Sequence, residues 1–305
     1  MISENEVLER VRNVTVWRRG GERAPHKPLL LLYALGKVEE GAPASISYES
    51  IDTDVGALLQ DFGPPRRTRA ADPYWYLRND GLWVVRDADS LELKANGKQP
   101  SERALRESGS EGGFPPEIFR LLHSKPQLRH RIARELLAHH FPASIHEDLL
   151  AAAGLPVDWA TMGPSDTPST GGKRSRRAGF RGEVLEAYGY ACAVCGFDLR
   201  LGHKTVGLDA AHIRWHTADG PDLVTNGLAL CAIHHRALDL GVVGVDLELC
   251  LTVSTKANGA RGFEEMFGRY SGAPIRKPHS YDLQPLPEHL EWHRSEVFRS
   301  PARRG

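Results

Sequence analysis

Two pairs of residues that can bind a metal lie in the second half of the chain. Cys192 and Cys195 form the segment C-A-V-C, and Cys231 and His234 form the segment C-A-I-H. Thiolate and imidazole ligands at two-residue gaps are typical of a tetrahedral structural zinc site. A redox C-x-x-C motif would not need a second pair, so the spacing favours zinc. We therefore predict that these four residues bind Zn²⁺, and we expect the fourth cysteine, Cys250, to be ordinary core.

The adjacent histidines that follow Cys231 must serve different sites. The sequence predicts a helix that begins near Ala232 and stops before Gly241. Neighbouring residues diverge by about 100° around a helix, so His234 and His235 cannot bind one metal together. His234 lies three residues after Cys231, on the same helix face, and is assigned to zinc. His235 is left for a second site.

A further set of polar residues comes in an order that suits phosphodiester hydrolysis. His212 ends a predicted strand over 206–213, and Asn226 precedes a second predicted strand over 227–230. Hydrolysis needs a water that is deprotonated near neutral pH, which a neutral imidazole with a pKa of about 6.5 can do. It also needs a cation that neutralises charge on the scissile phosphate.

The segments AAHIRWH and NGLALCAIHHRALDLG resemble the HNH, or ββα-metal, endonuclease family, and specifically its zinc-containing McrA-like branch. The resemblance implies that His212 is the general base and that Asn226 orients this base or its loop. It implies that His235 binds a catalytic divalent cation, such as Mg²⁺ or Mn²⁺. Many family members place Asp or His directly before the first catalytic histidine, where this chain has Ala211.

Two acidic residues are candidates for the missing metal ligand. Asp209 lies two residues before Ala211 on the same strand face, about 6.6 Å further along the strand. Direct ligation by Asp209 would need a twist of the strand or an intervening water. Asp239, which follows the helix in the segment LDLG, is either a ligand or a turn residue, and the turn is favoured.

The composition of the chain changes between its two halves. Residues 155–178 are rich in Pro, Gly, Ser and Thr and end in a basic cluster, so we predict a linker there. It separates a domain over 1–154 from a domain over 179–305, as the length of the chain allows. The predicted fold class is α+β: an N-terminal mixed α/β domain joined to a zinc-stapled ββα-metal HNH nuclease domain. A hairpin is expected around Asn79-Asp80-Gly81, and a helix is expected over 118–141.

The charge, the first residues and the length of the apolar runs limit the class of protein. The formal net charge is +0, which argues against a protein that coats DNA indiscriminately but leaves room for local basic patches. The first residues carry acidic side chains where a secretory signal would be basic and apolar, and no apolar run is long enough to span a bilayer. We therefore expect a cytoplasmic protein with no membrane partner.

The segments APHKPLLLL, PYWYLRNDGLW and LLAHHFPASIHEDLL resemble the sulfur-binding domains of phosphorothioate-dependent McrA-type restriction enzymes. The resemblance implies recognition of DNA in which sulfur replaces a non-bridging phosphate oxygen. Sulfur is larger and less hydrated than oxygen while the group stays anionic, so a reader should combine a small apolar cup with basic groups. The candidate cup and basic groups are Phe141, Pro142, Ala143 and Ser144, with His26, Lys27, Arg66, Arg67, Lys173 and Arg174. The alternative for Phe141 and Pro142 is an ordinary helix stop.

Together these features predict a modification-dependent, type IV-like restriction endonuclease that acts on double-stranded DNA carrying phosphorothioate. One alternative keeps the nuclease but has the first domain read a methylated or hydroxymethylated base, which would need an aromatic sandwich around a flipped base. A second alternative is a zinc module that binds DNA without catalysis, and the complete set of His212, Asn226 and His235 argues against it. Cutting both strands with one active site per chain favours a homodimer.

Overall fold

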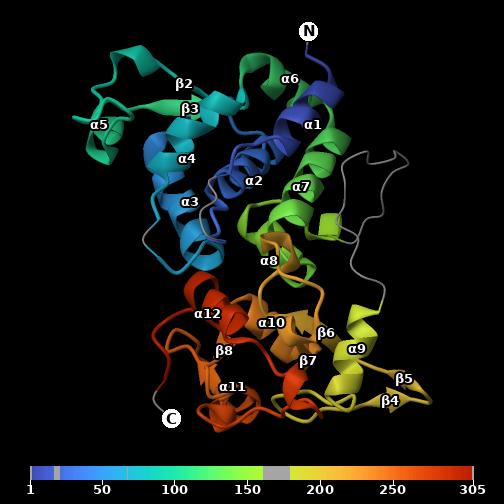
Figure 1. The fold of residues 1–305 in the computed structure, drawn as a ribbon. Coiled ribbons are helices and arrows are strands. Elements are labelled where there is room, and N and C mark those ends of the chain that lie inside the picture. The colour runs from blue at the N-terminus through green and yellow to red at the C-terminus, as the bar shows by residue number, and fades with distance from the viewer. Residues whose placement is uncertain (1, 17–20, 67, 161–178, 304–305) are drawn as a thin grey trace. The chain divides into compact units, whose positions relative to one another are not determined.

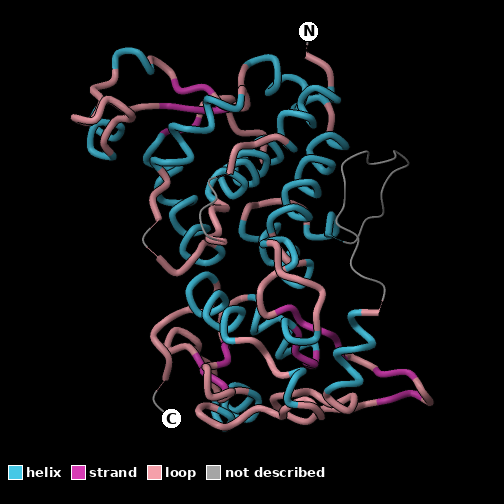
Figure 2. The backbone as a smooth tube through the Cα atoms, viewed as in Figure 1, coloured by secondary structure: helices cyan, strands magenta, loops and turns pink. Residues whose placement is uncertain are grey.

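The computed structural model describes residues 2–16, 21–66, 68–160 and 179–303 of the chain. The chain divides into two compact units, Met1–Met162 and Gly163–Gly305, here called unit 1 and unit 2 (Figure 1). Both units contain helices and antiparallel strands, which confirms the predicted α+β class (Figure 2). None of the helices in the described part of the chain has both the length and the apolar composition that crossing a bilayer requires.

Unit 1 is mainly helical and contains one small sheet. Its α-helices are α1 (Glu4–Arg12), α2 (His26–Glu39), α3 (Tyr48–Phe62), α4 (Ala71–Tyr76), α5 (Glu102–Glu107), α6 (Pro116–Ser124), α7 (Pro126–His140) and α8 (His146–Ala152). Its short 3₁₀ helices are η1 (Leu77–Asp80), η2 (Ala88–Ser90), η3 (Ala143–Ile145) and η4 (Val157–Ala160). The strands β1 (Ile46–Ser47), β2 (Val84–Val85) and β3 (Glu111–Gly113) form an antiparallel sheet in the order β1-β3-β2.

Helix α2 is the central element of unit 1. Every residue from Leu29 to Leu35 is buried, so this helix is apolar on all sides rather than on one face. A helix of that kind must be covered all round. Helices α3, α4, α6 and α7 pack against it. The buried aromatic rings of Tyr48, Tyr74 and Trp83 extend the core toward the sheet through edge-to-face contacts.

The prediction of a hairpin around Asn79-Asp80-Gly81 is wrong. The chain instead forms α4 and η1, and Gly81 ends η1 with a positive φ of 66°. The same residues that favour a hairpin turn also end a helix, because both structures need a left-handed residue. The carboxylate of Asp80 accepts hydrogen bonds from Thr15 N at 2.8 Å and Lys27 Nζ at 2.6 Å, which fixes this helix end to the start of α2.

Two other segments of unit 1 differ from the sequence-based expectation. The helix expected over 118–141 is two helices, α6 and α7, that are separated at Lys125 because Pro126 starts the second one. Residues 155–160, which the composition assigns to the linker, pack on unit 1. Trp159 is buried there, and its ring lies 5.2 Å from the ring of His130.

Three histidines of unit 1 make its stability depend on pH. Burial lowers the pKa of His26, His130 and His146 below the ordinary value of 6.5. The folded state therefore binds fewer protons than the unfolded state at mildly acidic pH, and stability falls as the pH drops below 6.5. We expect the amides of α7 and α8 to exchange faster at pH 5.5 than at pH 7.5, after correction for the intrinsic exchange rate, in native-state hydrogen exchange.

The variants His146→Gln and His139→Gln test this assignment. His146 is partly buried, and its Nε2 donates to the carbonyl of Phe141 at 3.0 Å, whereas His139 is exposed on α7. His146→Gln should reduce the dependence of unit 1 stability on pH, and His139→Gln should leave it nearly unchanged. Equal pH dependence in both variants and the parent would contradict the assignment.

Unit 2 contains four α-helices and three pairs of strands among its described residues. The helices are α9 (Phe180–Ala187), α10 (Ala232–Asp239), α11 (Arg261–Met266) and α12 (Pro287–Glu296), with 3₁₀ helices η5 (His216–Ala218), η6 (Val224–Asn226), η7 (Gly268–Tyr270) and η8 (Tyr281–Leu283). The antiparallel pairs are β4 (Arg200–Leu201) with β5 (Lys204–Thr205), β6 (Leu208–His212) with β7 (Gly227–Cys231), and β8 (Val243–Val245) with β9 (Leu251–Val253).

The strands β6 and β7, followed directly by α10, form the framework of unit 2. The register pairs Leu208 with Cys231 and His212 with Gly227. Helix α9 packs against both strands, and a Cβ on Gly227 would lie only 2.5 Å from Val184 Cγ2 of that helix. Glycine is therefore required at the start of β7, because any side chain there would push α9 away from the strand pair.

The last helix, α12, packs against β8 of unit 2. Leu290 and Trp292 are buried, and the ring of Trp292 meets that of Trp215 edge to face. His293 is buried as well, and its Nε2 donates to the carbonyl of Leu238 at 2.9 Å. This contact fits a structural role for His293. Cys250 is half-buried just before β9 rather than fully in the core.

Candidate active site and metal centre

The four predicted zinc ligands come together at the junction of the C-A-V-C turn with β7 and α10. One ligand atom from each of Cys192, Cys195, Cys231 and His234 lies within 4.8 Å of all the others. The distances are 3.7 Å from Cys192 Sγ to His234 Nδ1 and 4.0 Å between the sulfurs of Cys195 and Cys231. Ligands on a tetrahedral Zn²⁺ lie about 3.6 to 3.8 Å apart, so the cluster fits this ion.

Surrounding residues hold this cluster in a form that suits metal binding. Hydrogen bonds from Cys231 and His234 lower the pKa of the Cys192 thiol to about 3, and the thiolate is the form that binds metals. His234 Nε2 donates to the carbonyl of Met266 at 2.7 Å, which leaves Nδ1 to face the sulfurs. The ring of Phe267 packs edge to face on His234.

Asn226 is fully buried and ties together the loop between β6 and β7. Its Oδ1 accepts a hydrogen bond from Arg214 N at 2.8 Å. Its Nδ2 donates to the carbonyls of Arg214 and Pro221, each at 3.0 Å. Because Arg214 is two residues after His212, this clamp fixes the end of the strand that carries the histidine. This geometry fits the orienting role that the resemblance implies for Asn226.

His212 lies between an acidic group and an aromatic ring. Its Nε2 donates to Asp222 Oδ1 at 2.8 Å, and both side chains are largely buried. The ring of Phe180, at the start of α9, stacks on the imidazole with centroids 4.2 Å apart. His216 Nε2 lies 4.0 Å from the other oxygen of Asp222. The Asp222 contact selects the tautomer in which Nδ1 is the basic nitrogen.

His235 turns away from the cluster of four and meets Asp239 one helical turn later. His235 Nε2 and Asp239 Oδ2 are 3.2 Å apart, and the Asp239 side chain is only 2% exposed. Two adjacent ligands of a six-coordinate Mg²⁺ lie about 3 Å apart, so this pair fits two positions around such an ion. Among the described residues, only the Cys192 cluster brings three or more potential ligands within metal-binding distance.

The structure does not place Asp209 near His235 in any described contact. Its side chain is 52% exposed and lies 3.4 Å from the guanidinium of Arg181. The position before His212 is filled by the fully buried Ala211, which offers no ligand. Asp239, rather than Asp209, is therefore the acidic residue that lies next to His235.

In unit 1, the charge of Arg66 acts on His26, whereas Lys27 is paired with Asp80. Burial is the main cause of the lowered pKa of His26, and the charge of Arg66 lowers it further. Lys27 forms an ion pair with Asp80, and both of these side chains are largely buried. Arg66 donates to the backbone carbonyl of Arg23. Arg23, which the sequence did not single out, adds a buried positive charge beside His26.

The predicted apolar cup lies at the junction of α7 and α8. Phe141 is 1% exposed, so its ring belongs to the core and cannot contact a ligand in this conformation. Ala143 is exposed, and Pro142 and Ser144 are partly so, which makes these three the surface of the junction. The other three predicted DNA-binding residues, Arg67, Lys173 and Arg174, lie outside the described residues.

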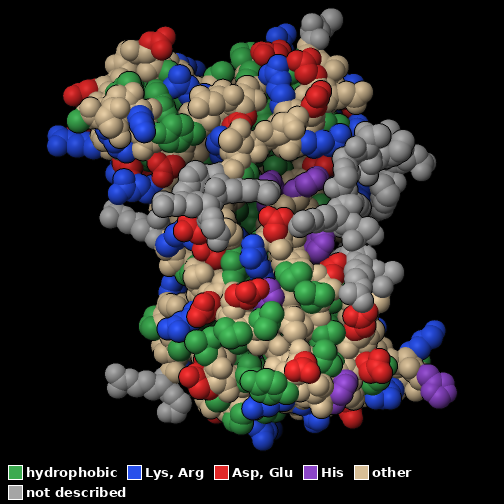
Figure 3. Space-filling model, in the orientation of Figure 1, with side chains coloured by type: hydrophobic (Ala, Val, Ile, Leu, Met, Phe, Trp, Pro, Cys, Tyr) green, Lys and Arg blue, Asp and Glu red, His purple; other side chains and the backbone are tan. Residues whose placement is uncertain are grey.

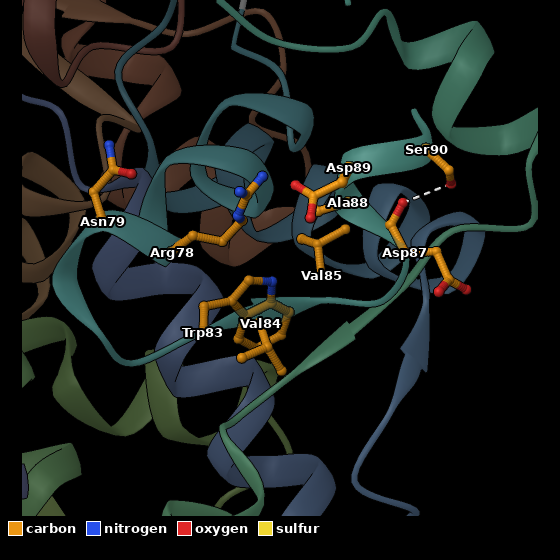
Figure 4. A pocket seen from close by; sticks show the side chains of 9 residues that line it. All are labelled: Arg78, Asn79, Trp83, Val84, Val85, Asp87, Ala88, Asp89 and Ser90. Atoms are coloured by element: carbon orange, nitrogen blue, oxygen red, sulfur yellow. Dashed lines mark hydrogen bonds between the residues drawn. The ribbon is translucent and has the colours of Figure 1, made fainter. Parts of the chain in front are cut away.

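A pocket of about 760 Å³ lies elsewhere in unit 1 and contains none of the predicted site residues (Figure 4). Its lining carries one cation and two carboxylates among apolar and uncharged polar side chains, and consists of Arg78, Asn79, Trp83, Val84, Val85, Asp87, Ala88, Asp89 and Ser90. The guanidinium of Arg78 lies 4.0 Å from the centre of the Trp75 ring, which accounts for its position.

Several site residues could not be found from the sequence. Asp222 lies in a polar loop ten residues after His212, and Phe180 comes 32 residues before it, so neither carries a periodic signal. His216 is partly buried beside His212, although a histidine in a loop would ordinarily be expected on the surface. The one signal in the sequence is that the loop segment Asp219-Gly220-Pro221-Asp222 contains acidic residues, which could be partners for the imidazole.

Comparison with known proteins gives a class to each unit. A family model for HNH endonucleases matches residues 192–246, which include β6, β7 and α10. A family model described as the ScoMcrA-like DNA sulfur-binding domain matches residues 4–158, just over half of the chain. The chain therefore belongs to the ScoMcrA-like DNA sulfur-binding domain family. Among curated proteins, the search finds no match.

Solved structures of sulfur-binding proteins are also similar to unit 1. The sulfur-binding domain of ScoMcrA, complexed with phosphorothioated DNA, is 29% identical with a TM-score of 0.44, and the match covers 48% of this chain and 94% of that one. The corresponding domain of SprMcrA, also complexed with phosphorothioated DNA, is 28% identical with a TM-score of 0.42, covering 52% and 97%. For the type IV phosphorothioation-dependent restriction endonuclease ScoMcrA, the match is 28% identical with a TM-score of 0.42 and covers 48% of this chain but only 27% of that protein.

Proposed function

We propose that this protein is a phosphorothioate-dependent restriction endonuclease of the type IV kind, in which unit 1 reads the modified backbone and unit 2 hydrolyses a phosphodiester bond nearby. The observation that carries the proposal is that two family models match the same chain. The model of a DNA sulfur-binding domain matches residues 4–158, and the model of an HNH endonuclease matches residues 192–246. The buried dyad of His212 and Asp222 next to the Asn226 clamp supports catalysis over a purely structural zinc module.

The geometry supports His212 as the general base. With Nε2 donating to Asp222, the lone pair lies on Nδ1, which can accept a proton from the attacking water. The stacked Phe180 ring prevents the imidazole from rotating, and Asn226 fixes the loop that follows. Asp222 favours the imidazolium that forms when the proton is taken up, as a carboxylate behind a catalytic histidine does in other hydrolases.

His235 and Asp239 would hold the catalytic cation, which is Mg²⁺, Mn²⁺ or another divalent metal. A divalent cation at this place supplies charge neutralisation at the scissile phosphate and at the leaving oxygen. The chain contributes one neutral imidazole and one carboxylate, so the remaining positions around the ion are left for water and phosphate oxygen. The proposed role of Cys192, Cys195, Cys231 and His234 is to bind a structural Zn²⁺ that holds the start of α10 against the C-A-V-C turn.

For unit 1, we propose that sulfur contacts the surface formed by Pro142, Ala143 and Ser144, while His26 and Arg66 help to hold the charged backbone. These three small side chains provide the weakly polar contact that suits a poorly hydrated sulfur atom. The aromatic rings Tyr74 and Trp83 are buried in the core, so they do not form an exposed sandwich for a flipped base. Trp75 and Tyr76 are partly exposed, so the match to the DNA sulfur-binding domain is what favours the backbone reader over the base reader.

Plasmid cleavage tests the proposal directly. The full chain is incubated with Mg²⁺ or Mn²⁺ and with matched plasmids that carry phosphorothioate, methylated cytosine, hydroxymethylated cytosine or no modification. We expect cutting of the phosphorothioated plasmid only. Equal cutting of all four would exclude dependence on modification, and selective cutting of a base-modified plasmid would support the rival reader.

Gel shifts with the full-length His212→Ala variant separate binding from cutting. The variant should bind a phosphorothioated duplex more tightly than the same duplex with ordinary phosphate. Replacing Ala143 by Asp should abolish this preference, because a carboxylate repels the anionic backbone.

Light scattering of the complex also tests the homodimer, which we propose because each chain has one nuclease centre for two strands.

Asp222 gives a more specific prediction about the dyad. The variant Asp222→Asn should lower kcat by about 10- to 10³-fold with little change in KM, because the neutral amide no longer favours the correct tautomer or the imidazolium. Asp219→Asn is the matched control, since Asp219 is exposed in the same loop. Kinetics in which both variants cleave like the parent would exclude the proposed role of Asp222.

A further inference from the structure

The hairpin formed by β4 and β5 is a strongly exposed part of unit 2. Leu201, next to the turn, is 76% exposed, and Leu199 and Val206 at the base are 54% and 42% exposed. Arg200, His203 and Lys204 are exposed beside them. The two strands extend away from the rest of unit 2 in Figure 1, and Lys or Arg and His side chains stand out at this place in Figure 3. An exposed apolar surface of this kind, rimmed by polar residues, marks a binding surface.

The charge of the hairpin indicates what it binds. Residues 198–208 contain an arginine, a lysine and a histidine, and one acidic residue, the exposed Asp198 at the base of the hairpin. The next acidic residue along the chain, Asp209, is already paired with Arg181 at 3.4 Å. The hairpin therefore presents positive charge around exposed Leu201, which suits a polyanion with an apolar interior such as duplex DNA.

The base of the hairpin is fixed to the elements that carry the nuclease centre. Arg181 of α9 donates from Nη2 to the carbonyl of Leu208 at 2.6 Å and to Thr205 Oγ1 at 3.2 Å. Ala232 N, at the start of α10, donates to the carbonyl of Gly207 at 3.0 Å. The hairpin then continues directly into β6, which ends at His212. A ligand held by the hairpin is thus held at a fixed position relative to the base.

We propose that the β4–β5 hairpin enters the major groove of the DNA beside the cleavage site, with Arg200 and Lys204 on the phosphates and Leu201 against the base edges. This inference rests on the proposed nuclease function. A two-stranded ribbon fits the major groove, which is about 12 Å wide, and is too broad for the minor groove, which is about 6 Å wide. Arg200 is held over the ring of Tyr190, 5.1 Å from its centre, and Leu201 pairs with Lys204 across the ribbon.

The test compares charge variants in the full-length His212→Ala background, which cannot cut. The double variant Arg200→Ala/Lys204→Ala should bind a phosphorothioated duplex with a salt dependence that is less steep by about 2, one for each phosphate that the variant no longer neutralises. Its matched control is Arg269→Ala/Lys256→Ala, because Arg269 is an exposed arginine over a tyrosine ring and Lys256 is an exposed lysine of the same unit. The control should keep the salt dependence of the parent.

Leu201→Ser tests the apolar contact, with Leu247→Ser as its control because Leu247 is 50% exposed. Dimethyl sulfate footprinting should show guanine N7 protection in the major groove that Leu201→Ser loses and Leu247→Ser keeps. Unchanged protection and salt dependence in all hairpin variants would overturn the inference while leaving the nuclease intact. A change in oligomeric mass without a change in DNA binding would also overturn it, in favour of a contact between copies. If the parent binds no DNA, both this inference and the proposed function fail.

Discussion

Replacing His212 by alanine should lower the rate of DNA cleavage by roughly 10²- to 10⁴-fold, the contribution expected of a general base. The effect should be in kcat, because the role proposed for the imidazole is to deprotonate the attacking water and not to bind the DNA. His212 is enclosed by Asp222 and by the stacked ring of Phe180, so no neighbouring side chain has the same position and tautomer. Single-turnover cleavage of a phosphorothioated duplex in excess enzyme measures this step.

The control for this prediction is His216→Ala. His216 is the neighbouring ring, with centroids 5.8 Å from His212, but its Nε2 is 4.0 Å from Asp222. The removal of His216 should lower the cleavage rate much less than the removal of His212. Both variants should keep the zinc content and the DNA affinity of the parent, which shows that the fold is intact. Cleavage by His212→Ala at the parental rate would exclude this residue as the base.

Replacing Cys192 by serine should abolish zinc binding and unfold unit 2. The side chain of Cys192 is fully buried among the other three ligands, so the hydroxyl that replaces the thiolate cannot satisfy the ion. Structural zinc contributes about 10–16 kcal/mol in small zinc domains, as much as or more than the whole stability of a typical domain. Metal analysis should fall from about one zinc per chain to none, and cleavage should be lost with it.

Cys250→Ser is the matched control for the zinc prediction, because Cys250 is the one cysteine outside the cluster. It should keep the zinc, the thermal unfolding of unit 2 and the cleavage rate. In the Cys192→Ser variant, native-state hydrogen exchange should still show protected amides in α2 of unit 1, since no ligand comes from that unit. Retention of one zinc per chain by Cys192→Ser would contradict the assigned ligand set.

The parts of the fold that could be predicted are those fixed by local spacing. The gap between Cys231 and His234 places both on one helix face, and the structure brings them together with the C-A-V-C turn. The alternation in β6 and the run in β7 predicted two strands that end at His212 and begin after Asn226, which is where the structure has them.

The parts that could not be predicted depend on contacts that sequence spacing does not encode. Asp222 reaches His212 because the Asn226 clamp folds the loop back on the strand. The pairing of His235 with Asp239 is different, because it follows from a spacing of four residues on one helix, which the sequence does encode. The hairpin prediction around Asn79 was wrong for a different reason. A left-handed glycine can end a 3₁₀ helix as well as form a hairpin turn, and local sequence does not distinguish the two. Phe141 was expected at a surface cup, but the apolar contact it gains in the core is larger.

Helix α10 carries the proposed ligands of two metal sites within eight residues, and this limits how the gene can vary. His234 faces the cysteines while His235 and Asp239 face the other way, so one inserted or deleted residue at the start of the helix would rotate every later ligand by about 100°. Both sites would then lose their ligands at once. By contrast, the exposed Gly202-His203 turn of the β4–β5 hairpin can accept extra residues without disturbing the hydrogen bonds at its base. Length variation in unit 2 should therefore be confined to the hairpin turn and excluded from α10.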